Sequence, residues 1–334
     1  MLNSLCALAL GFLLDMCLGN KGGKFSSAGI IRTLIYKITK FLKGAYADSA
    51  AAQGAAGGVL LFFTLFIVTG ISLLILLAAY KIHVVLGIIC EGLMCKSALN
   101  IRNFRIEAVG IFRTVKNGSE ELAAKRVKKL SGKETENMTM DEIASMGIET
   151  IAKRTNEFAV APIFYIFFLG GLGAMIYETV FLLDEFAGHK TKHFRMYGKA
   201  SARMKDVLDF IPSKICSLII IFDCYFLKLN GKNAIKVYKR DRKKAFAPAQ
   251  GHMISAMAGG LGIALYSPEY EENPDADNPE DFSEMTIRDK NTIGTALKEI
   301  IPQDIYWAIQ LFCGTAAYSV ILAALLKTVI SIIL

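Results

Sequence analysis

Two carboxylates of this chain lie where an acidic side chain is costly without a partner. Glu149 stands among apolar residues of a predicted helix, and Asp184 closes a long apolar run. A buried carboxylate needs a cation or hydrogen-bond donors, and an acidic group at the edge of a membrane segment is a candidate for function. We therefore expect Glu149 to bind a ligand or to form a salt bridge, and Asp184 to belong to a functional site.

Two further charged pairs allow a functional and a plainer interpretation. Arg203 and Asp206 are three positions apart, so they can pair with one another on a helix. Lys133 and Glu134 lie in a charged stretch and can form a solvated turn. Both pairs stay candidates for a site that binds charged ligands.

The composition indicates a membrane protein. The chain has 334 residues, of which 53% are hydrophobic and 20% charged, and its mean hydropathy is +0.41. A membrane-spanning helix needs about 20 mostly apolar residues. Five runs reach or approach that length, which is too many for the core helices of one soluble protein, and strand signals are nearly absent. The sequence predicts an all-α, polytopic integral membrane protein, with apolar segments at residues 2–18, 57–80, 158–183, 214–229 and 311–334.

The charge distribution predicts contact with lipid. The formal net charge of +8 is concentrated in residues 21–43, 190–214 and 228–244. Such clusters beside apolar spans are typical of cytoplasmic flanks that face anionic lipid, although they would also attract phosphate-bearing substrates. Nothing resembles a nucleic-acid-binding module. We expect a multi-pass protein of the cytoplasmic membrane, with membrane lipid and no nucleic acid among its partners.

Metal-binding patterns are weak. The seven cysteines are scattered without a CxxC pair, so we expect them to be small buried apolar residues. His189 and His193 are four positions apart and supply half of a metal site. The sequence offers no third ligand at a suitable spacing.

The polar parts of the chain are predicted to complete one domain over residues 1–334. Residues 96–157 read as an aqueous helical segment, with a turn before a helix capped by Ser119 and a capping box that starts at Thr139. Residues 230–310 form a long polar loop, whose middle is rich in proline and acidic residues.

Three glycines interrupt the apolar run at residues 158–183. Gly170, Gly171 and Gly173 weaken a helix by about 1 kcal/mol each relative to alanine. They serve either close helix–helix packing or a broken, re-entrant helix whose amides line a site. We expect a break here, which would bring the segments before and after the run to the same side of the membrane.

The order of several short motifs resembles one family, the CobD/CbiB proteins, which are the membrane-bound adenosylcobinamide-phosphate synthases of cobalamin biosynthesis. No single motif is diagnostic, but their order and spacing are. The motifs are Gly11-Phe12-Leu13-Leu14-Asp15, Gly132-Lys133-Glu134-Thr135, Ile148-Glu149-Thr150-Ile151-Ala152, Ala159-Val160-Ala161-Pro162, Gly170-Gly171-Leu172-Gly173, Leu183-Asp184, Tyr197-Gly198-Lys199-Ala200-Ser201 and Ala258-Gly259-Gly260-Leu261-Gly262.

The resemblance implies an ATP-dependent amide-forming reaction. It would join aminopropanol, or its phosphate, to a carboxylate of adenosylcobyric acid, with activation by ATP and Mg²⁺; a corrinoid and a small amine would be the substrates, and other corrinoid-pathway enzymes possible partners. Such a site needs carboxylates for metal or proton transfer, and cations and amides for phosphates and oxyanions. The candidates are Glu134, Glu149, Asp184 and Asp206 as catalytic acids, Asp184 and Asp206 also as metal ligands, and Lys133, Arg203, Gly170, Gly171, Gly173, Gly259 and Gly260 as substrate or phosphate contacts.

The chain departs from the family pattern at polar positions. A glutamate-asparagine pair is replaced by Lys153 and Arg154, and the following aspartate by Glu157. An aspartate is replaced by Lys205, and an asparagine by Asp209. Apolar and glycine positions survive, so the pattern is that of a kept fold with altered chemistry.

Three functions are compatible with this pattern. The first is an active synthase, which is also expected to bind an adenosylated corrinoid. The second is a catalytically altered relative that serves as a membrane scaffold, a corrinoid-binding protein or an AmpE-like signalling protein. The third is a transporter, suggested by acidic residues in or near the apolar runs, although no two-fold repeat supports it.

Overall fold

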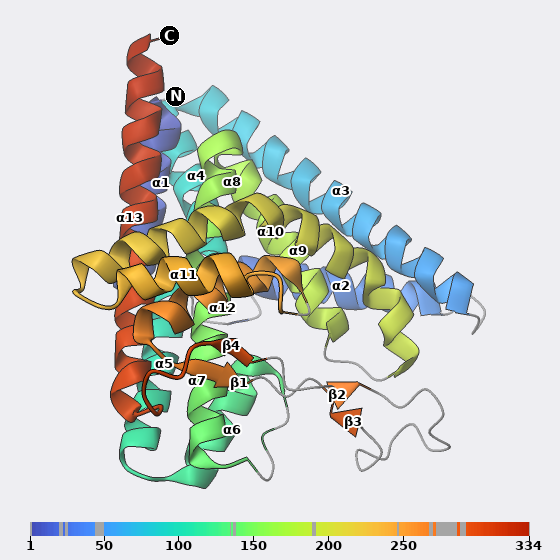
Figure 1. The fold of residues 1–334 in the computed structure, drawn as a ribbon. Helices are drawn as coiled ribbons and strands as arrows, with labels where there is room; N and C mark the ends of the chain where they lie inside the picture. Colours follow the sequence, from blue (N-terminus) through green and yellow to red (C-terminus); the bar gives the residue numbers. More distant parts are fainter. Residues whose placement is uncertain are drawn as a thin grey trace. The chain divides into compact units, whose positions relative to one another are not determined.

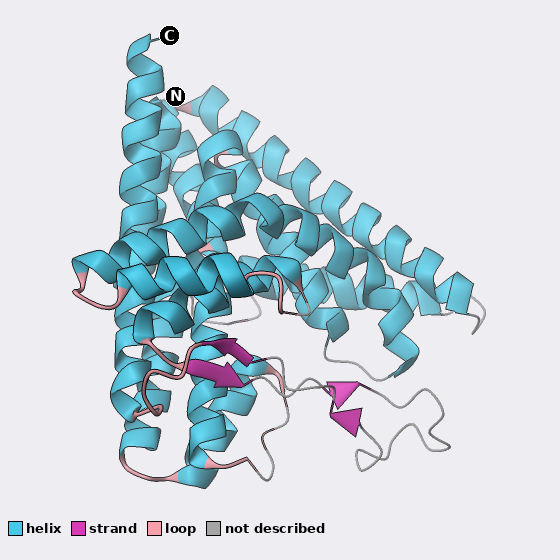
Figure 2. Ribbon diagram, in the orientation of Figure 1, coloured by secondary structure: helices cyan, strands magenta, loops and turns pink. Residues whose placement is uncertain are grey.

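The computed structural model describes residues 2–19, 23, 26–43, 50–133, 135, 138–188, 192–245, 247–266, 270–271, 286–287 and 292–333. These residues are predominantly helical, as predicted (Figure 2). The elements are α1 (Leu2–Leu18), α2 (Ser27–Lys43), α3 (Ala50–Ile82), α4 (Val84–Ala98), α5 (Ile101–Lys116), α6 (Glu120–Ser131), α7 (Met140–Thr155), the π-helical turn η1 (Asn156–Val160), α8 (Ala161–Leu169), α9 (Gly171–Gly188), α10 (Lys192–Phe226), α11 (Gly231–Asp241), α12 (Pro248–Leu261), β1 (Ala264–Tyr266), β2 (Tyr270–Glu271), β3 (Thr286–Ile287), β4 (Thr292–Gly294) and α13 (Pro302–Ile333) (Figure 1).

Among the described residues, three helical segments are long and apolar enough to cross a membrane. They are Ala52–Ile82, Val84–Lys116 and Pro302–Ile333, and the apolar helix Asn3–Leu18 is shorter. Large apolar side chains on α3, such as Phe66 and Leu74, are each 68% exposed, as expected for a surface that faces lipid. The all-α membrane class is thus supported, but five apolar spans are not confirmed. The run at residues 158–183 is divided among η1, α8 and α9. The run at 214–229 begins inside α10, whose earlier half carries many charges.

The chain divides into two compact units, which we describe separately. The first unit comprises Met1–Phe104, Asn156–Pro212 and Ala316–Leu334, and the second comprises Arg105–Thr155 and Ser213–Thr315. The expectation of one functional domain over the whole chain stays a prediction.

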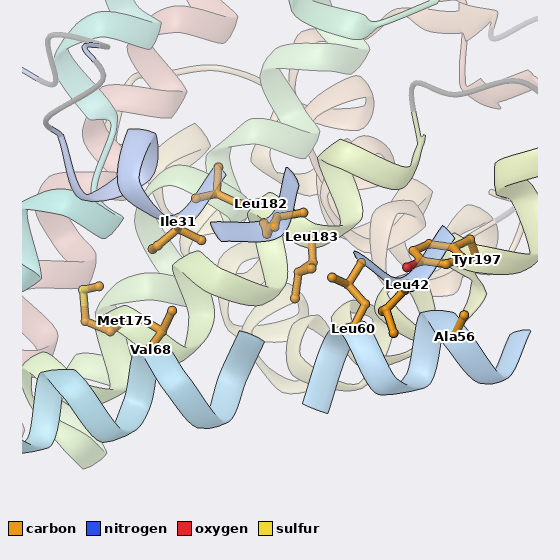
Figure 3. Packing of buried hydrophobic residues seen from close by; sticks show 10 residues of the cluster. Ile31, Leu42, Ala56, Leu60, Val68, Met175, Leu182, Leu183 and Tyr197 are labelled. Atoms are coloured by element: carbon orange, nitrogen blue, oxygen red, sulfur yellow. The ribbon is translucent and has the colours of Figure 1, made fainter. Parts of the chain in front are cut away.

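In the first unit, α2, α3 and α9 share a hydrophobic cluster, joined by Tyr197 at the start of α10 (Figure 3). α2 carries Ile31, Ile35, the partly buried Ile38 and Leu42 at intervals of three to four residues, which is the spacing of one helix face. The buried members of the cluster are Ile31, Ile35, Leu42, Ala56, Leu60, Val68, Met175, Leu182, Leu183 and Tyr197. This packing fixes the C-terminal half of α9, which carries the predicted site residue Asp184.

The predicted break in the apolar run is confirmed at Gly170. This residue ends α8 with φ +60° and ψ −142°, a conformation that is essentially restricted to glycine. The chain then reverses its direction. The contact between the two helices shows this, since the rings of Tyr165 on α8 and Tyr177 on α9 stack with their centroids 5.6 Å apart. A Cβ atom on Gly173 would lie 2.2 Å from the carbonyl oxygen of Tyr165, so this glycine permits the close approach. α8 and α9 therefore form a helical hairpin.

A carboxylate from α4 holds the turn of this hairpin. Glu91 is buried, with 7% exposure, and accepts a hydrogen bond of 3.2 Å from the amide of Gly171, the first residue of α9. The hydroxyl of Tyr80 on α3 donates to the other carboxylate oxygen. A carboxylate at a helix N-terminus satisfies an amide that has no partner within the helix. The hairpin turn is thus fixed by the protein itself.

In the second unit, α7 packs against α12 and β1, and α12 packs against α11. The predicted capping box is present, since Thr139 and Glu142 bond to each other's backbone amides at the start of α7. Ser119 does precede α6, but its side chain makes no capping hydrogen bond, so that detail was wrong. The sequence also gave no sign of the short antiparallel pair β1–β4, whose register places Leu265 opposite Ile293.

Candidate active site

Where the hairpin opens, the π-helical turn η1 brings two polar side chains into the interior of the first unit. A π-helical turn inserts one extra residue into a helix and often occurs at functional sites. Asn156 is completely buried and Glu157 is 9% exposed. Both residues come directly after the predicted aqueous segment and directly before the apolar run.

Lys205 of α10 lies between two of the buried carboxylates. Its Nζ atom is 2.5 Å from Oε1 of Glu157 and 2.9 Å from Oδ2 of Asp209, one helical turn further on. The exposure of Lys205 is 7%, and that of Asp209 is 5%. The ammonium group therefore balances two carboxylates away from water.

Neutral donors complete the coordination of Asp209. The other carboxylate oxygen, Oδ1, accepts hydrogen bonds of 2.9 Å from Nδ2 of Asn156 and from the hydroxyl of Tyr177. We call Asn156, Glu157, Tyr177, Lys205 and Asp209 the buried charge cluster. It links η1, α9 and α10 of the first unit through hydrogen bonds that water does not weaken.

The electrostatics of the cluster follow from its composition. Burial alone would lower the pKa of the Lys205 ammonium, but the carboxylates of Glu157 and Asp209 outweigh burial and raise it. Burial raises the pKa of the Asp209 carboxyl, and Lys205 opposes that rise. Lys205 is thus held in its charged form.

Asp184 lies at the margin of the buried charge cluster. It is half-buried, and burial is the main cause that raises the pKa of its carboxyl to about 6. Lys205 opposes this rise, whereas the carboxylates of Glu157 and Asp209 add to it. Within the described part of the chain, the Asp184 carboxylate makes no hydrogen bond or salt bridge. It is therefore the acidic group of this region that is best placed to accept an external cation or proton.

The other two predicted residues of α10 lie on a different face from Lys205. Arg203 and Asp206 are exposed, whereas Lys205 and Asp209 are buried at a spacing of four residues. The structure thus brings Asp206 near Asp184, whose pKa it helps to raise, and leaves Arg203 at the surface. Lys205 and Asp209 were not among the predicted site residues. The sequence did contain a signal for them, because both positions depart from the pattern that the chain resembles.

Glu149 has formed the predicted salt bridge inside the second unit. Its side chain is 4% exposed and contacts Nζ of Lys153, one turn further along α7. Nζ of Lys133 lies 3.6 Å from the same carboxylate oxygen, Oε1. Two of the predicted site residues, Lys133 and Glu149, are therefore neighbours, while Glu134 lies outside the described residues.

The glycines predicted to contact substrate have packing roles in the structure. Gly170, Gly171 and Gly173 build the hairpin as described above. A Cβ atom on Gly259 would lie 2.8 Å from Cα of Ala234, and one on Gly260 would lie 2.3 Å from Sγ of Cys224. These positions allow helices to approach closely, and contact with substrate stays a prediction for all five.

A resident Mg²⁺ ion does not fit the buried charge cluster, because Lys205 already occupies the point on which Glu157 and Asp209 converge. Among the residues that the structure describes, no group of three or more histidine, cysteine or acidic side chains is arranged to hold a metal ion. His189 lies outside the described residues, and nothing is described of the His193 side chain. Metal contact by Asp184 and Asp206 stays a prediction.

Comparison with known proteins identifies the family. The model of the family described as "CobD/Cbib protein" matches residues 8–312. The chain is 26% identical over 327 residues to a protein of Clostridium perfringens, covering 98% of this chain and 99% of that protein. It is 28% identical over 313 residues to one of Listeria monocytogenes, covering 94% and 95%. A protein of Streptococcus sanguinis is 30% identical over 256 residues, covering 77% of each chain. 

All three relatives are named "Cobalamin biosynthesis protein CobD". No solved structure matches the chain. The family match extends over both the hairpin and the buried charge cluster, and so includes the elements that position the site. The chain belongs to the CobD/CbiB family.

Proposed function

We propose that this protein is a synthase of cobalamin biosynthesis that forms an amide bond between aminopropanol, or its phosphate, and a carboxylate of adenosylcobyric acid. The observation that carries the proposal is the family match over residues 8–312, together with relatives named for cobalamin biosynthesis that align over nearly their whole length. We place the protein in the cytoplasmic membrane as a multi-pass protein, with its site open to cytoplasmic ATP.

Amide formation from a free carboxylate requires activation, which ATP would supply through its phosphoryl group. Mg²⁺ would enter with ATP as part of that substrate, since Mg²⁺ in such complexes needs only one or two protein carboxylates besides the phosphates. Asp184 and Asp206 are the neighbouring carboxylates that can contact it. Asp184 is suited to this role. A bound cation would stabilise its ionised carboxylate and so offset the burial and the repulsion that raise its pKa.

The remaining side chains would bind phosphate groups, orient neighbouring charged groups and position Asp184. Arg203 is exposed, and its guanidinium group can contact a phosphate in a bidentate manner. Lys133 lies beside the buried Glu149 carboxylate, which would orient its ammonium group. The buried charge cluster positions Asp184 by connecting α9 to α10 and η1. The cluster would therefore contribute to the site by holding the three elements, and with them Asp184, in fixed positions.

The direct test is an assay of the purified protein in detergent with adenosylcobyric acid, ATP, Mg²⁺ and aminopropanol phosphate. Mass spectrometry should detect the amide product only when ATP and the amine are both present. Alanine at Glu134, Glu149, Asp184 or Asp206 should lower turnover by about 10²–10³ where the carboxylate holds metal or transition-state charge. Near-normal turnover in all four folded variants would place the site elsewhere.

A catalytically altered protein is the second candidate, and a specific observation favours it. Lys205 neutralises Glu157 and Asp209, and Lys153 neutralises Glu149, so buried carboxylates that could serve chemistry are occupied by lysines of the chain. Such a protein would bind the corrinoid without converting it. Titration of adenosylcobyric acid, followed by its visible absorbance, separates the two candidates. Binding without product supports this one, and absence of binding at millimolar corrinoid rejects the synthase and the corrinoid-binding form alike.

A further inference from the structure

In the buried charge cluster, two carboxylates surround one ammonium group. Carboxylate oxygens from two separate elements, Glu157 on η1 and Asp209 on α10, lie within 2.5 and 2.9 Å of one point, which is the Nζ atom of Lys205. Asp184 adds a third negative charge that acts on the same ammonium. Oxygen ligands that converge on one position are the usual surroundings of Mg²⁺ or Mn²⁺.

The surroundings of this point are prepared for carboxylates that stay charged. Asn156 and Tyr177 donate to Oδ1 of Asp209 and leave its Oδ2 to Lys205. Hydrogen bonds to the ionised form compensate for its burial. The Asp209 carboxylate is thus oriented by donors other than the lysine, and its position does not depend on Lys205 alone.

We propose that the ammonium group of Lys205 is a built-in cation that takes the place of a divalent metal ion in the buried charge cluster, so that Glu157 and Asp209 bind no metal ion in this chain. A lysine supplies one positive charge on a tether, and it cannot leave or exchange. The cluster is then indifferent to the metal content of the medium. Removal of the ammonium should expose a divalent-cation site formed by Glu157 and Asp209 beside Asp184.

The sequence pattern of positions 205 and 209 fits this exchange. Lys205 and Asp209 are one helical turn apart on the buried face of α10, and the cation and the anion contact one another. A buried charge without a partner is strongly unfavourable. The pair therefore acts as one unit.

The test measures metal binding to the full chain in detergent, with Mn²⁺ alone as the probe and without ATP or corrinoid. Lys205→Ala should bind about one Mn²⁺ per chain more than the unaltered protein, as counted by electron paramagnetic resonance of the free ion. In EDTA its Tm should be lower by about 5 °C or more, because buried carboxylates are left without their cation. Millimolar Mn²⁺ should restore most of that loss, and the Tm of the unaltered protein should not respond.

Two control variants test whether a gain in Mn²⁺ binding comes from the buried charge cluster. Lys199→Ala removes an exposed lysine from the same helix and should gain no Mn²⁺ binding. Lys205→Ala with Asp209→Asn should lose the gained site, since one of its ligands is removed. If Lys205→Ala does not fold even with Mn²⁺ present, the exchange Lys205→Asp with Asp209→Asn provides a second acidic arrangement at the same point.

The proposal is overturned if neither Lys205→Ala nor the double exchange binds more Mn²⁺ than the unaltered protein. It is also overturned if the unaltered protein binds Mn²⁺ in a way that Glu157→Gln or Asp209→Asn abolishes. Both outcomes are read without turnover, so they leave the proposed synthase activity to its own assay.

Discussion

Replacement of Asp184 by asparagine should stabilise the fold. The carboxylate is half-buried, and its pKa is raised from 3.8 to about 6, first by burial and then by neighbouring carboxylates. A group whose pKa is raised in the folded state stabilises that state while it is protonated, and this contribution is lost as the pH rises. At neutral pH the ionised Asp184 therefore destabilises the protein, and Asp184→Asn removes the charge.

The size of the effect follows from the pKa. Each tenfold change in the ionisation constant is about 1.4 kcal/mol, so a rise from 3.8 to about 6 amounts to at most about 3 kcal/mol. Asp184 is partly open to solvent, which screens the neighbouring charges. We therefore expect a gain of about 1–2 kcal/mol in the free energy of unfolding above about pH 6, or a Tm higher by about 2–4 °C. The gain should shrink between about pH 6 and pH 4 and vanish below about pH 4.

Thermal unfolding in detergent, followed by tryptophan fluorescence or circular dichroism between pH 4 and pH 8, measures this profile. Asp206→Asn is the matched control, because it removes an exposed carboxylate and should change stability by less than about 0.5 kcal/mol. An Asp184→Asn protein that is no more stable than the unaltered protein at pH 8 would refute the electrostatic reasoning. A gain in stability combined with a loss of turnover would support a functional role for Asp184, since active-site charges are commonly held at the expense of stability.

Three further predictions test the hairpin, the second unit and the topology. Gly170→Ala should lower the free energy of unfolding by about 2 kcal/mol or more, because φ is +60° and the new Cβ would lie 2.1 Å from Oε1 of Glu91. Gly58→Ala, where the Cβ meets nothing within 4 Å, should raise it by about 0.5–1 kcal/mol, and equal Tm changes in the two variants would contradict this explanation. Asp241→Asn should lower the Tm at pH 7, because Arg240, Lys244 and the amide of Gly294 outweigh burial and hold the pKa of this carboxyl at about 2. That deficit should diminish as the pH falls from about 4 towards about 2, and a deficit independent of pH would reject the ionic cause. Finally, cysteines introduced at Lys133 and Lys199 in a protein without its native cysteines should be labelled from the same side of the membrane, because the hairpin reverses the chain; labelling from opposite sides would refute a re-entrant hairpin.

The sequence by itself determined the class of the protein and several of its elements. Long apolar runs require a helix in lipid, since every backbone polar group must be satisfied within the segment. The break at Gly170 was also accessible, because clustered glycines weaken a helix wherever it lies. The order of short motifs was enough to suggest the family that the comparisons then showed. All of these features depend on residues that are close in the sequence.

Only the tertiary structure decided which charges meet. Positions 157, 177 and 209 are far apart along the chain, and they converge because the hairpin reverses at Gly170 and α10 returns beside it. The family resemblance suggested Arg203 and Asp206 as site residues, but a sequence pattern does not say which face of a helix is buried. In α10 the buried face carries Lys205 and Asp209 instead. A charged residue can occupy the interior when a partner from another element compensates it, and that partner is known only once the chain is folded.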